Sequence, residues 1–197
     1  MKTKRILASL LCIAMLMALM PTVIFADSAT DEATAAWLNE SGNKLYVGAI
    51  EVTADNAADI IGRRYSGEDI TGNASFKVEN DVPTLYLDNV TVKDGYKYGK
   101  FNGDYYYKIY GIYYKSASND KLTIKLSGAN VIEAKGYTDD KHTGSSETYG
   151  IITEGACTEL MLEGGENSSL KVASEENALA VYNGVDYDEW GNCVISI

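Results

Sequence analysis

The sequence predicts an all-β protein, and within that class a right-handed parallel β-helix (a solenoid) with a short helical cap at its N-terminal end. Two observations predict this fold. Short stretches such as Leu122–Leu126 alternate apolar and polar residues, which is the pattern of a half-buried strand. The Tyr-Gly-Ile sequence at 110–112 and the strand-turn-strand plan behind it return at 149–151, and such recurrence is typical of solenoids. Each coil buries its inward side chains only against neighbouring coils, so stacking supplies the core.

Residues 1–26 have the features of a secretory signal peptide. Met1–Arg5 carries three positive charges and no acid, Ile6–Met20 is almost wholly apolar, and Ala26 offers a small residue before Asp27. The apolar run is short for a membrane span. We therefore expect a secreted, extracellular or cell-surface protein rather than a membrane-spanning one.

Charge and cysteine content narrow the class further. Without the signal peptide, 14 basic residues stand against 28 acidic ones, a net charge of −14 compared with −11 for the whole chain. A field of that sign opposes nucleic acid as a partner. Only Cys157 and Cys193 remain, so the chain is not a disulfide scaffold. The repeat alignment points Cys193 inward and Cys157 outward, which disfavours a bridge between them.

Two predicted domains follow the signal peptide, a linker at 27–43 and the solenoid at 44–197. The linker has the composition of a loop or a short fraying helix, with Trp37 and Leu38 tucked onto the core. The solenoid begins with two short strands between 44 and 52. Thr53–Gly62 then fits a two-turn helix, with Thr53 as N-cap and Gly62 at the C-cap, and we assign Leu45–Gly62 to the cap over the first coil.

The coils follow in order. After a loop at 63–74, Ser75–Glu79 and Leu85–Val92 alternate as strands of the first coil, with Pro83 at a turn between them. A β-sandwich could also carry such strands, but the blocks recur as copies and tight hairpin signals are sparse. Insertions are predicted at 93–109, 137–148 and 185–192. The remaining blocks form successive coils, with these residues inward: Leu122, Ile124, Leu126, Leu160, Leu162, Leu170 and Val172.

The last copy is aligned with Val181–Gly184 repeating Ile152–Gly155. Cys193–Ile197 begins a strand that has no successor. The predicted solenoid is therefore incomplete at its C-terminus, as in a fragment of a longer protein.

The order of blocks LYVGAIEVTADNAADIIG, ASFKVENDVPTLYLDNVTV and YGI…LTIKLSGANVI resembles secreted right-handed parallel β-helix proteins of Clostridia-type bacteria. Those proteins are often labelled as carbohydrate-binding domains. The resemblance covers nearly everything from Leu45 onward. It implies a non-catalytic extracellular module, with calcium and acidic glycans among its ligands. The family offers no binding-site residues that can be carried over to this chain.

The segment 96–114 holds eight of the chain's 15 tyrosines, with lysines among them. Tyrosine offers a flat apolar face and a hydroxyl group, which suits contact with sugar rings. Ammonium groups suit uronates or phosphate-bearing wall polymers. The alternative is that tyrosines favour strands and cover a sheet face. The glycan-binding residues predicted here are Tyr96, Lys97, Tyr98, Lys100, Tyr105, Tyr106, Tyr107 and Lys108.

Two further segments bear on calcium binding and on catalysis. Asp186, Asp188 and Glu189 resemble the start of an EF-hand loop, but Trp190 replaces the third ligand, which leaves a looser surface calcium site as the prediction. Catalysis is not expected, because the one histidine, His142, lacks partners at ligand or triad spacing. The two arginines left after the signal peptide fall in the cap-to-coil loop, away from any coil face where a polysaccharide lyase would need its base.

The sequence thus predicts a secreted or cell-surface, non-catalytic module that recognises polysaccharide or cell-wall glycan. Two alternatives stay open. One is a structural or adhesive spacer of a larger surface protein, which would meet protein partners. The other is a polysaccharide-degrading β-helix, either a lyase or a hydrolase with clustered acids.

Overall fold

The computed structural model describes residues 31–62, 69–93, 95–98, 107–118, 121–135, 146–157, 159–181 and 194–196. This part of the chain is mostly β, with one α-helix, α2 (Glu32–Asn39). Sheet A contains β1 (Lys44–Val47), β2 (Ile50–Glu51), β5 (Tyr96–Tyr98), β6 (Tyr107–Ser116), β9 (Ser146–Gly155) and β12 (Asn177–Val181). Sheet B contains β3 (Ile70–Glu79), β4 (Val82–Val92), β7 (Lys121–Ser127), β8 (Ala129–Ala134), β10 (Glu159–Gly164), β11 (Ser169–Ser174) and β13 (Val194–Ser196). None of the described helical residues form a segment with the length and hydropathy that crossing a membrane requires.

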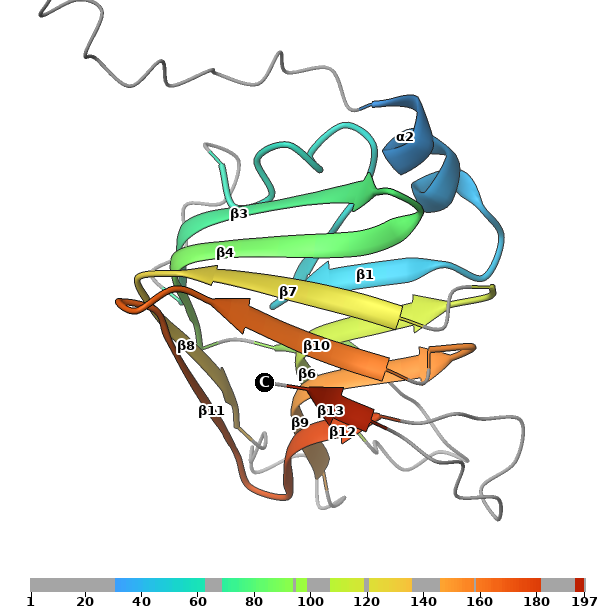
Figure 1. Cartoon of the computed structure of the whole chain (residues 1–197). Helices are drawn as coiled ribbons and strands as arrows, with labels where there is room; N and C mark the ends of the chain where they lie inside the picture. The colour runs from blue at the N-terminus through green and yellow to red at the C-terminus, as the bar shows by residue number, and fades with distance from the viewer. Residues whose placement is uncertain are drawn as a thin grey trace, which may run out of the picture.

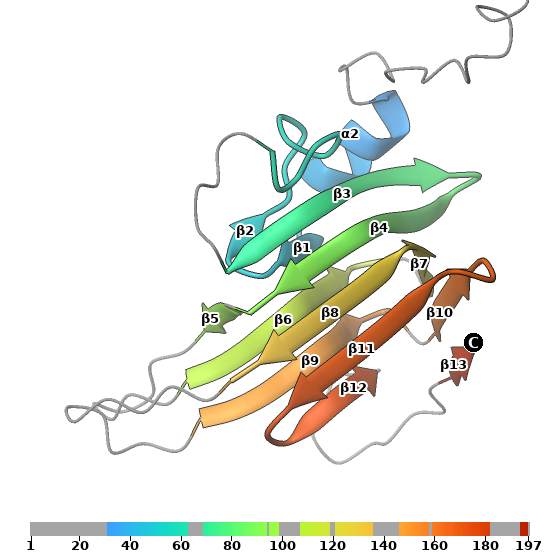
Figure 2. The same cartoon turned by 90° about the vertical axis from the view of Figure 1, so that its left-hand side faces the viewer.

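Parallel pairing stacks strands that are one repeat apart in the sequence. β6, β9 and β12 pair in parallel in sheet A, and β7, β10 and β13 do so in sheet B. β8 and β11 form a third parallel pair, and Figures 1 and 2 show the stacks curling around a shared interior. The long strand β4 pairs first with β7 and then with β8, so it begins two of the stacks. The predicted all-β class is confirmed, with parallel strands in curled sheets.

The two copies of Tyr-Gly-Ile lie side by side in register. Tyr110 of β6 is opposite Tyr149 of β9, and Ile112 is opposite Ile151. The sequence alignment of these two copies is therefore confirmed at the level of strand pairing.

The third copy is displaced by one residue from the predicted alignment. Ala180, not Val181, lies opposite Ile152. Such a shift exchanges the two faces of a strand, and Val181 accordingly packs on the interior core while Ala180 packs on the outer face of sheet A. The start of β12 is fixed by Thr148, whose hydroxyl oxygen accepts the N–H groups of Glu175–Glu176 at 2.9 and 3.1 Å.

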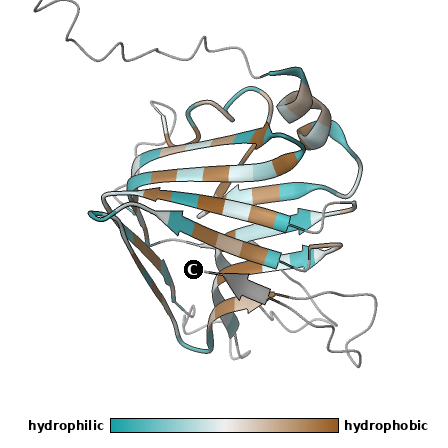
Figure 3. Ribbon diagram, viewed as in Figure 1, coloured by the Kyte–Doolittle hydropathy of each residue, from teal (hydrophilic) through white to brown (hydrophobic). Residues whose placement is uncertain are grey.

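The core fills the space between the sheets, and the strands show alternating bands of hydropathy (Figure 3). Leu122 and Ile124 are fully buried as predicted, and Leu126 is half-buried. The four residues predicted to point inward in the next coil all pack with the same core, the first fully buried and the others half-buried: Leu160, Leu162, Leu170 and Val172. Burial thus decreases toward the last coil, where fewer described strands cover the interior.

β7 and β8 are joined by a tight turn at Gly128, in keeping with the strand-turn-strand plan expected after Tyr-Gly-Ile. Gly128 has a φ of +63°, a conformation that favours glycine. Asn130 is buried at this corner, and its amide nitrogen donates to the carbonyl oxygens of Ser127 and Ser169. Its side-chain oxygen accepts the N–H of Val90 at 2.9 Å, so one side chain links three successive levels of the stack.

β3 and β4 form an antiparallel hairpin where the sequence predicted an open first coil. Its turn, Asn80–Asp81, has φ values of 49° and 66°, and two positive φ values are typical of a hairpin turn that matches strand twist. Pro83 lies within β4 opposite Val78, not at the turn. The N–H of Val78 points away from β4 and donates to the hydroxyl oxygen of Thr34 in α2. Val78 and Pro83 therefore form a pair without hydrogen bonds between them, so the missing N–H of the proline costs no bond in the sheet. β3 also starts at Ile70, inside the predicted loop.

The predicted cap helix at Thr53–Gly62 is wrong, because this segment forms turns. Its backbone forms turn hydrogen bonds around Thr53–Asp59, and two further bonds join the segment to the neighbouring strand β3. The N–H of Ile60 donates to the carbonyl of Ala74 at 2.8 Å, and the N–H of Phe76 donates to the carbonyl of Ala57 at 2.7 Å. Pairing with an otherwise open strand edge thus prevailed over local helix propensity.

The helix that does cover this end is α2, inside the segment predicted as a linker or fraying helix. Asp31 caps it by accepting the N–H of Thr34 at 2.7 Å. Trp37 is 6% exposed and stacks on Tyr114 of β6 with ring centroids 5.4 Å apart. Leu38 also packs on the core, so the predicted contact of Trp37 and Leu38 with the core is confirmed.

Cys157 is buried, whereas the sequence alignment pointed it outward. It lies in the connection between β9 and β10, where the alternation of a strand does not apply. It joins the interior core, and its Sγ lies 3.5 Å from the carbonyl oxygen of Glu159. Cys193 falls outside the described residues.

Candidate functional site

The segment predicted to bind glycan begins and ends on sheet A. β5 pairs antiparallel with β6, with Tyr96 opposite Tyr110 and Tyr98 opposite Lys108. The backbone therefore brings the two ends of the segment together on the sheet. All predicted binding residues except Lys108 lie at least partly outside the described part. Only the backbone is described for Tyr96, Lys97, Tyr98 and Tyr107, and nothing is described for Lys100, Tyr105 and Tyr106.

Lys108 is the one predicted binding residue whose side chain the structure describes. Its Nζ lies 3.2 Å from a carboxylate oxygen of Glu147, the residue directly opposite in β9. The hydroxyl of Tyr149 donates to the same carboxylate at 3.0 Å. The charge of Lys108 is thus matched within the sheet, and its side chain is 24% exposed.

The outer face of sheet A carries a buried aromatic cluster. We name it the tyrosine cluster, and it consists of Tyr46, Tyr110, Tyr113 and Tyr149. Neighbouring ring centroids are 4.9 to 6.2 Å apart, and no member is more than 9% exposed. The hydroxyl of Tyr113 donates to Glu154 at 2.9 Å. Tyr110 and Tyr113, together with Tyr114 in the core, therefore serve packing, as the β-propensity alternative expects.

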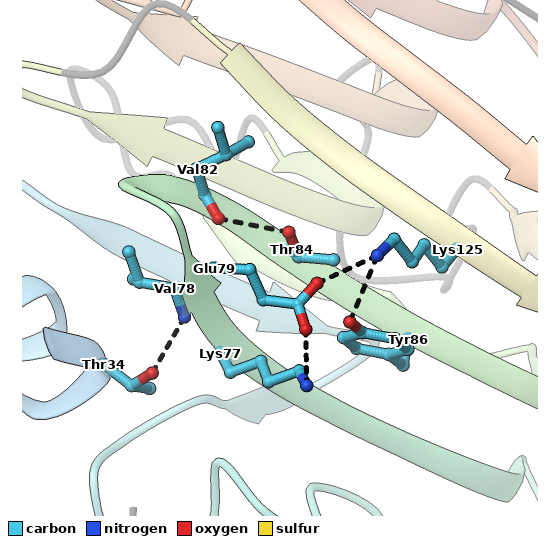
Figure 4. A network of polar contacts seen from close by, with 8 residues as sticks. All are labelled: Thr34, Lys77, Val78, Glu79, Val82, Thr84, Tyr86 and Lys125. Carbon is cyan, nitrogen blue, oxygen red and sulfur yellow. Dashed lines mark hydrogen bonds and ion pairs between the residues drawn. The ribbon is translucent and has the colours of Figure 1, made fainter. Parts of the chain in front are cut away.

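A second cluster of polar side chains lies on the outer face of sheet B (Figure 4). We name it the Tyr86 cluster, and it consists of Lys77 and Glu79 from β3, Tyr86 from β4 and Lys125 from β7. The carboxylate of Glu79 lies between the two ammonium groups and forms ion pairs with both, at 2.9 Å in the case of Lys125. The Nζ atoms of Lys77 and Lys125 are 5.0 and 5.3 Å from the centroid of the Tyr86 ring.

Electrostatics hold every member of the Tyr86 cluster in one protonation state near neutral pH. The hydrogen bond from Lys77, followed by those involving Tyr86 and Lys125, lowers the pKa of Glu79 to about 2. The hydrogen bond to Glu79 raises the pKa of both lysines, and burial raises the pKa of Tyr86. This cluster therefore offers fixed charges and no group poised for general acid–base catalysis.

The Tyr86 cluster was not predicted from the sequence, although part of the signal was present. Tyr86 lies between the buried residues Leu85 and Leu87, and Lys125 follows the buried Ile124. Period-two alternation therefore places both side chains on the outer face. The register that puts Lys125 opposite Tyr86, between strands about 40 residues apart, is not visible in either strand alone.

The remaining predicted sites lie outside the described residues: Asp186, Asp188 and Glu189 for calcium, together with His142 and both arginines. Within the described ranges, no group of three or more His, Cys, Asp or Glu side chains is arranged to hold a metal ion.

Comparison with known proteins gives no match to any family profile, curated protein or solved structure. The resemblance to β-helix proteins of Clostridia-type bacteria stays a prediction.

Proposed function

We propose that the chain is a right-handed parallel β-helix that serves as a secreted or cell-surface, non-catalytic module for binding polysaccharide. The strand order supports this fold, because β6, β7 and β8 are followed by β9, β10 and β11, each pairing in parallel with its counterpart. Parallel strands in one sheet are connected with right-handed crossovers in nearly all proteins. The signal-peptide pattern of residues 1–26 supports secretion.

One observation carries the binding function. The antiparallel pairing of β5 with β6 holds both ends of the tyrosine- and lysine-rich segment on a sheet. Segments displayed by a rigid scaffold are the usual carriers of binding residues. Tyr105, Tyr106 and Tyr107 would supply flat faces for sugar rings, and Lys97 and Lys100 would supply cations for acidic groups of a wall glycan.

A non-catalytic role is supported by the chemistry of the Tyr86 cluster. Glu79 stays ionised and both lysines stay protonated across the pH range in which an acid–base pair would have to exchange protons. A lyase or a hydrolase remains the rival proposal. Release of unsaturated or reducing ends from pectin by the purified protein would establish it.

The second candidate function is a structural or adhesive spacer that meets protein partners. The ion pair of Lys108 with Glu147 favours it, because a predicted binding residue is committed to a contact within the sheet. Tyr110 and Tyr113, from the same tyrosine-rich segment, are also buried. A spacer retains no polysaccharide, acidic or neutral, with or without calcium.

The test compares the triple variant Tyr105→Ala, Tyr106→Ala, Tyr107→Ala with the wild type on a polysaccharide array. Tyr137→Ala, in the next predicted insertion, is the matched control. We expect the triple variant to lose at least tenfold in affinity, because each aromatic contact contributes about 0.5–1.5 kcal/mol, and the control to bind normally. Equal binding by all three proteins, with unchanged circular dichroism, would remove this segment from the proposal.

The calcium proposal has its own test. If Asp186, Asp188 and Glu189 ligate calcium, millimolar calcium should raise the melting temperature of the wild type, since a ligand that binds only the folded state stabilises it. The double variant Asp186→Asn, Asp188→Asn should not respond. An identical response from both proteins would exclude these residues as ligands.

A further inference from the structure

We propose that the Tyr86 cluster is a second subsite, in which Lys77 and Lys125 bind a carboxylate of an acidic ligand. The inference rests on the proposed function in one respect, namely that the carboxylate belongs to a polysaccharide. The site itself follows from the contacts on the outer face of sheet B. It lies on strands β3, β4 and β7 of sheet B (Figure 4), whereas β5, the described start of the predicted glycan-binding segment, belongs to sheet A.

The cluster already holds one carboxylate. Glu79 receives an ion pair from each lysine, and the two ammonium groups lie on either side of its carboxylate (Figure 4). The geometry that a ligand carboxylate would need is therefore present and occupied by a side chain of the protein. Glu79 positions the lysines and also competes with any external anion.

Part of the hydrogen-bonding capacity of the lysines is unused. An ammonium group has three N–H donors. Lys125 directs donors to Glu79 and to the hydroxyl oxygen of Tyr86, at 2.9 and 3.4 Å, and Lys77 directs one to Glu79. A hydrogen bond also joins Lys77 to Tyr86. Within the described residues this leaves one donor direction on each lysine, and the side chains are 47% and 38% exposed for Lys77 and Lys125. An anion can approach these donors from solvent.

The ratio of cations to carboxylates differs between this cluster and two other ion pairs on the outer faces. Lys121 is matched by Glu159 at 3.5 Å, and Lys108 is matched by Glu147. The Tyr86 cluster instead has two cations for one carboxylate. Glu163 lies opposite Lys125 in register but forms no ion pair with it within the described residues. Within the cluster two ammonium groups thus share one carboxylate, and the carboxylate of Glu163 belongs to the neighbouring strand.

Three strands hold the lysines at this separation. Lys77 and Glu79 share β3, and the ring of Tyr86 lies in the adjacent strand beside both amines. Lys125 is opposite Tyr86 in β7. Ordering of these side chains by the ring and by Glu79 lowers the entropy lost when a ligand binds.

The decisive variant is Glu79→Gln, because a ligand-binding role predicts tighter binding and a purely structural role predicts weaker or unchanged binding. If the lysines bind ligand, removing the competing carboxylate tightens binding of trigalacturonate by about three- to fivefold, the size expected for an exposed ion pair. Lys77→Ala combined with Lys125→Ala should weaken binding by at least as much. Glu159→Gln, which frees Lys121 on the same face, is the matched control and should have little effect. Titration calorimetry at low and high salt measures all four proteins, with maltotriose as the neutral ligand.

The outcomes are distinguishable from those for the proposed function. Binding of acidic polysaccharide that persists unchanged in the double lysine variant overturns the subsite and leaves the proposed function standing. Absence of all polysaccharide binding by the wild type, with trigalacturonate binding by Glu79→Gln, overturns the proposed function and supports the subsite. Weaker or unchanged binding by Glu79→Gln, with its circular dichroism intact, shows that the cluster only joins strands.

Discussion

The glycine of the Tyr-Gly-Ile repeat provides the sharpest test of the stacked arrangement. A Cβ atom on Gly150 would lie 2.2 Å from Cγ1 of Val172 in β11 and 2.5 Å from the carbonyl oxygen of Ala178 in β12. A Cβ on Gly111, one coil earlier, would meet the carbonyl oxygen of Gly150 and Cγ2 of Ile132, each at 2.5 Å. The repeat therefore keeps glycine because successive coils approach each other too closely there for any side chain.

The magnitude for Gly150→Ala follows from what would have to move. The side chain of Val172 can rotate, but the carbonyl of Ala178 belongs to the backbone, so β12 must shift. Overpacking of a close-packed site typically lowers the free energy of unfolding by about 1–3 kcal/mol. Because a backbone atom is in the way here, we expect a loss of about 3 kcal/mol. Gly165→Ala is the control, because its Cβ would meet only Oγ of Ser168 at 4.0 Å. We expect the control to change the free energy of unfolding by less than about 0.5 kcal/mol.

Urea unfolding followed by tryptophan fluorescence and circular dichroism measures both variants against the wild type. A second variant, Gly150→Ala with Val172→Ala, should recover part of the loss, because it relieves one of the two close contacts. If Gly150→Ala were as stable as Gly165→Ala, β9 could not lie against β11 and β12 as described. Such a result would refute the stacking of the last coil.

Three further predictions concern the core and the Tyr86 cluster. Ile124→Ala should lower the free energy of unfolding by about 2–5 kcal/mol, and Leu162→Ala by distinctly less. Ile124 is fully buried, whereas Leu162, opposite it in the next parallel strand, is half-buried. Urea midpoints compare the two variants, and equal losses would contradict the decrease in burial toward the last strands. The pKa of Glu79 is lowered from 4.5 to about 2, so its stabilisation is present above pH 4.5 and lost as the pH falls toward 2. Because the side chain of Glu79 is 28% exposed, we expect this pH-dependent stabilisation to be only about 1 kcal/mol. Urea midpoints between pH 2 and 6 measure it, and Glu79→Gln should lack it. Cys157 should react with a thiol reagent only when the protein unfolds, and rapid labelling of the native protein would contradict its burial.

Most strands after residue 107, and the parallel pairing of the first two Tyr-Gly-Ile copies, were predictable because alternation and recurrence are visible in the sequence. Alternation identified Leu122 and Ile124 as interior residues, and recurrence identified Tyr110 and Tyr149 as equivalent. The first part of the chain was predicted less well. The turn at Asn80–Asp81 lacks glycine and was not recognised as a hairpin, although both residue types tolerate a positive φ.

The misplaced cap has a related cause. Thr53–Gly62 carries good helix termini, but the decisive contacts are backbone hydrogen bonds to Ala74 and Phe76 of β3. Those contacts depend on which strand edge lies nearby. No local pattern contains that information, whereas the composition of 32–39 did allow the short helix that is present.

The division between inner and outer faces explains where a binding site can be sought in a stack of this kind. Inward positions are constrained by the coils above and below, as Gly150 and the buried Ile124 illustrate. Outward positions need only balance their charges with the neighbouring strands, and Lys108 and Lys121 do so with one glutamate each. An outward group that leaves charge unmatched is not required by the stack. Because the cluster around Tyr86 has two cations for one carboxylate, it is a described part of the surface where selection for a ligand would explain what packing does not.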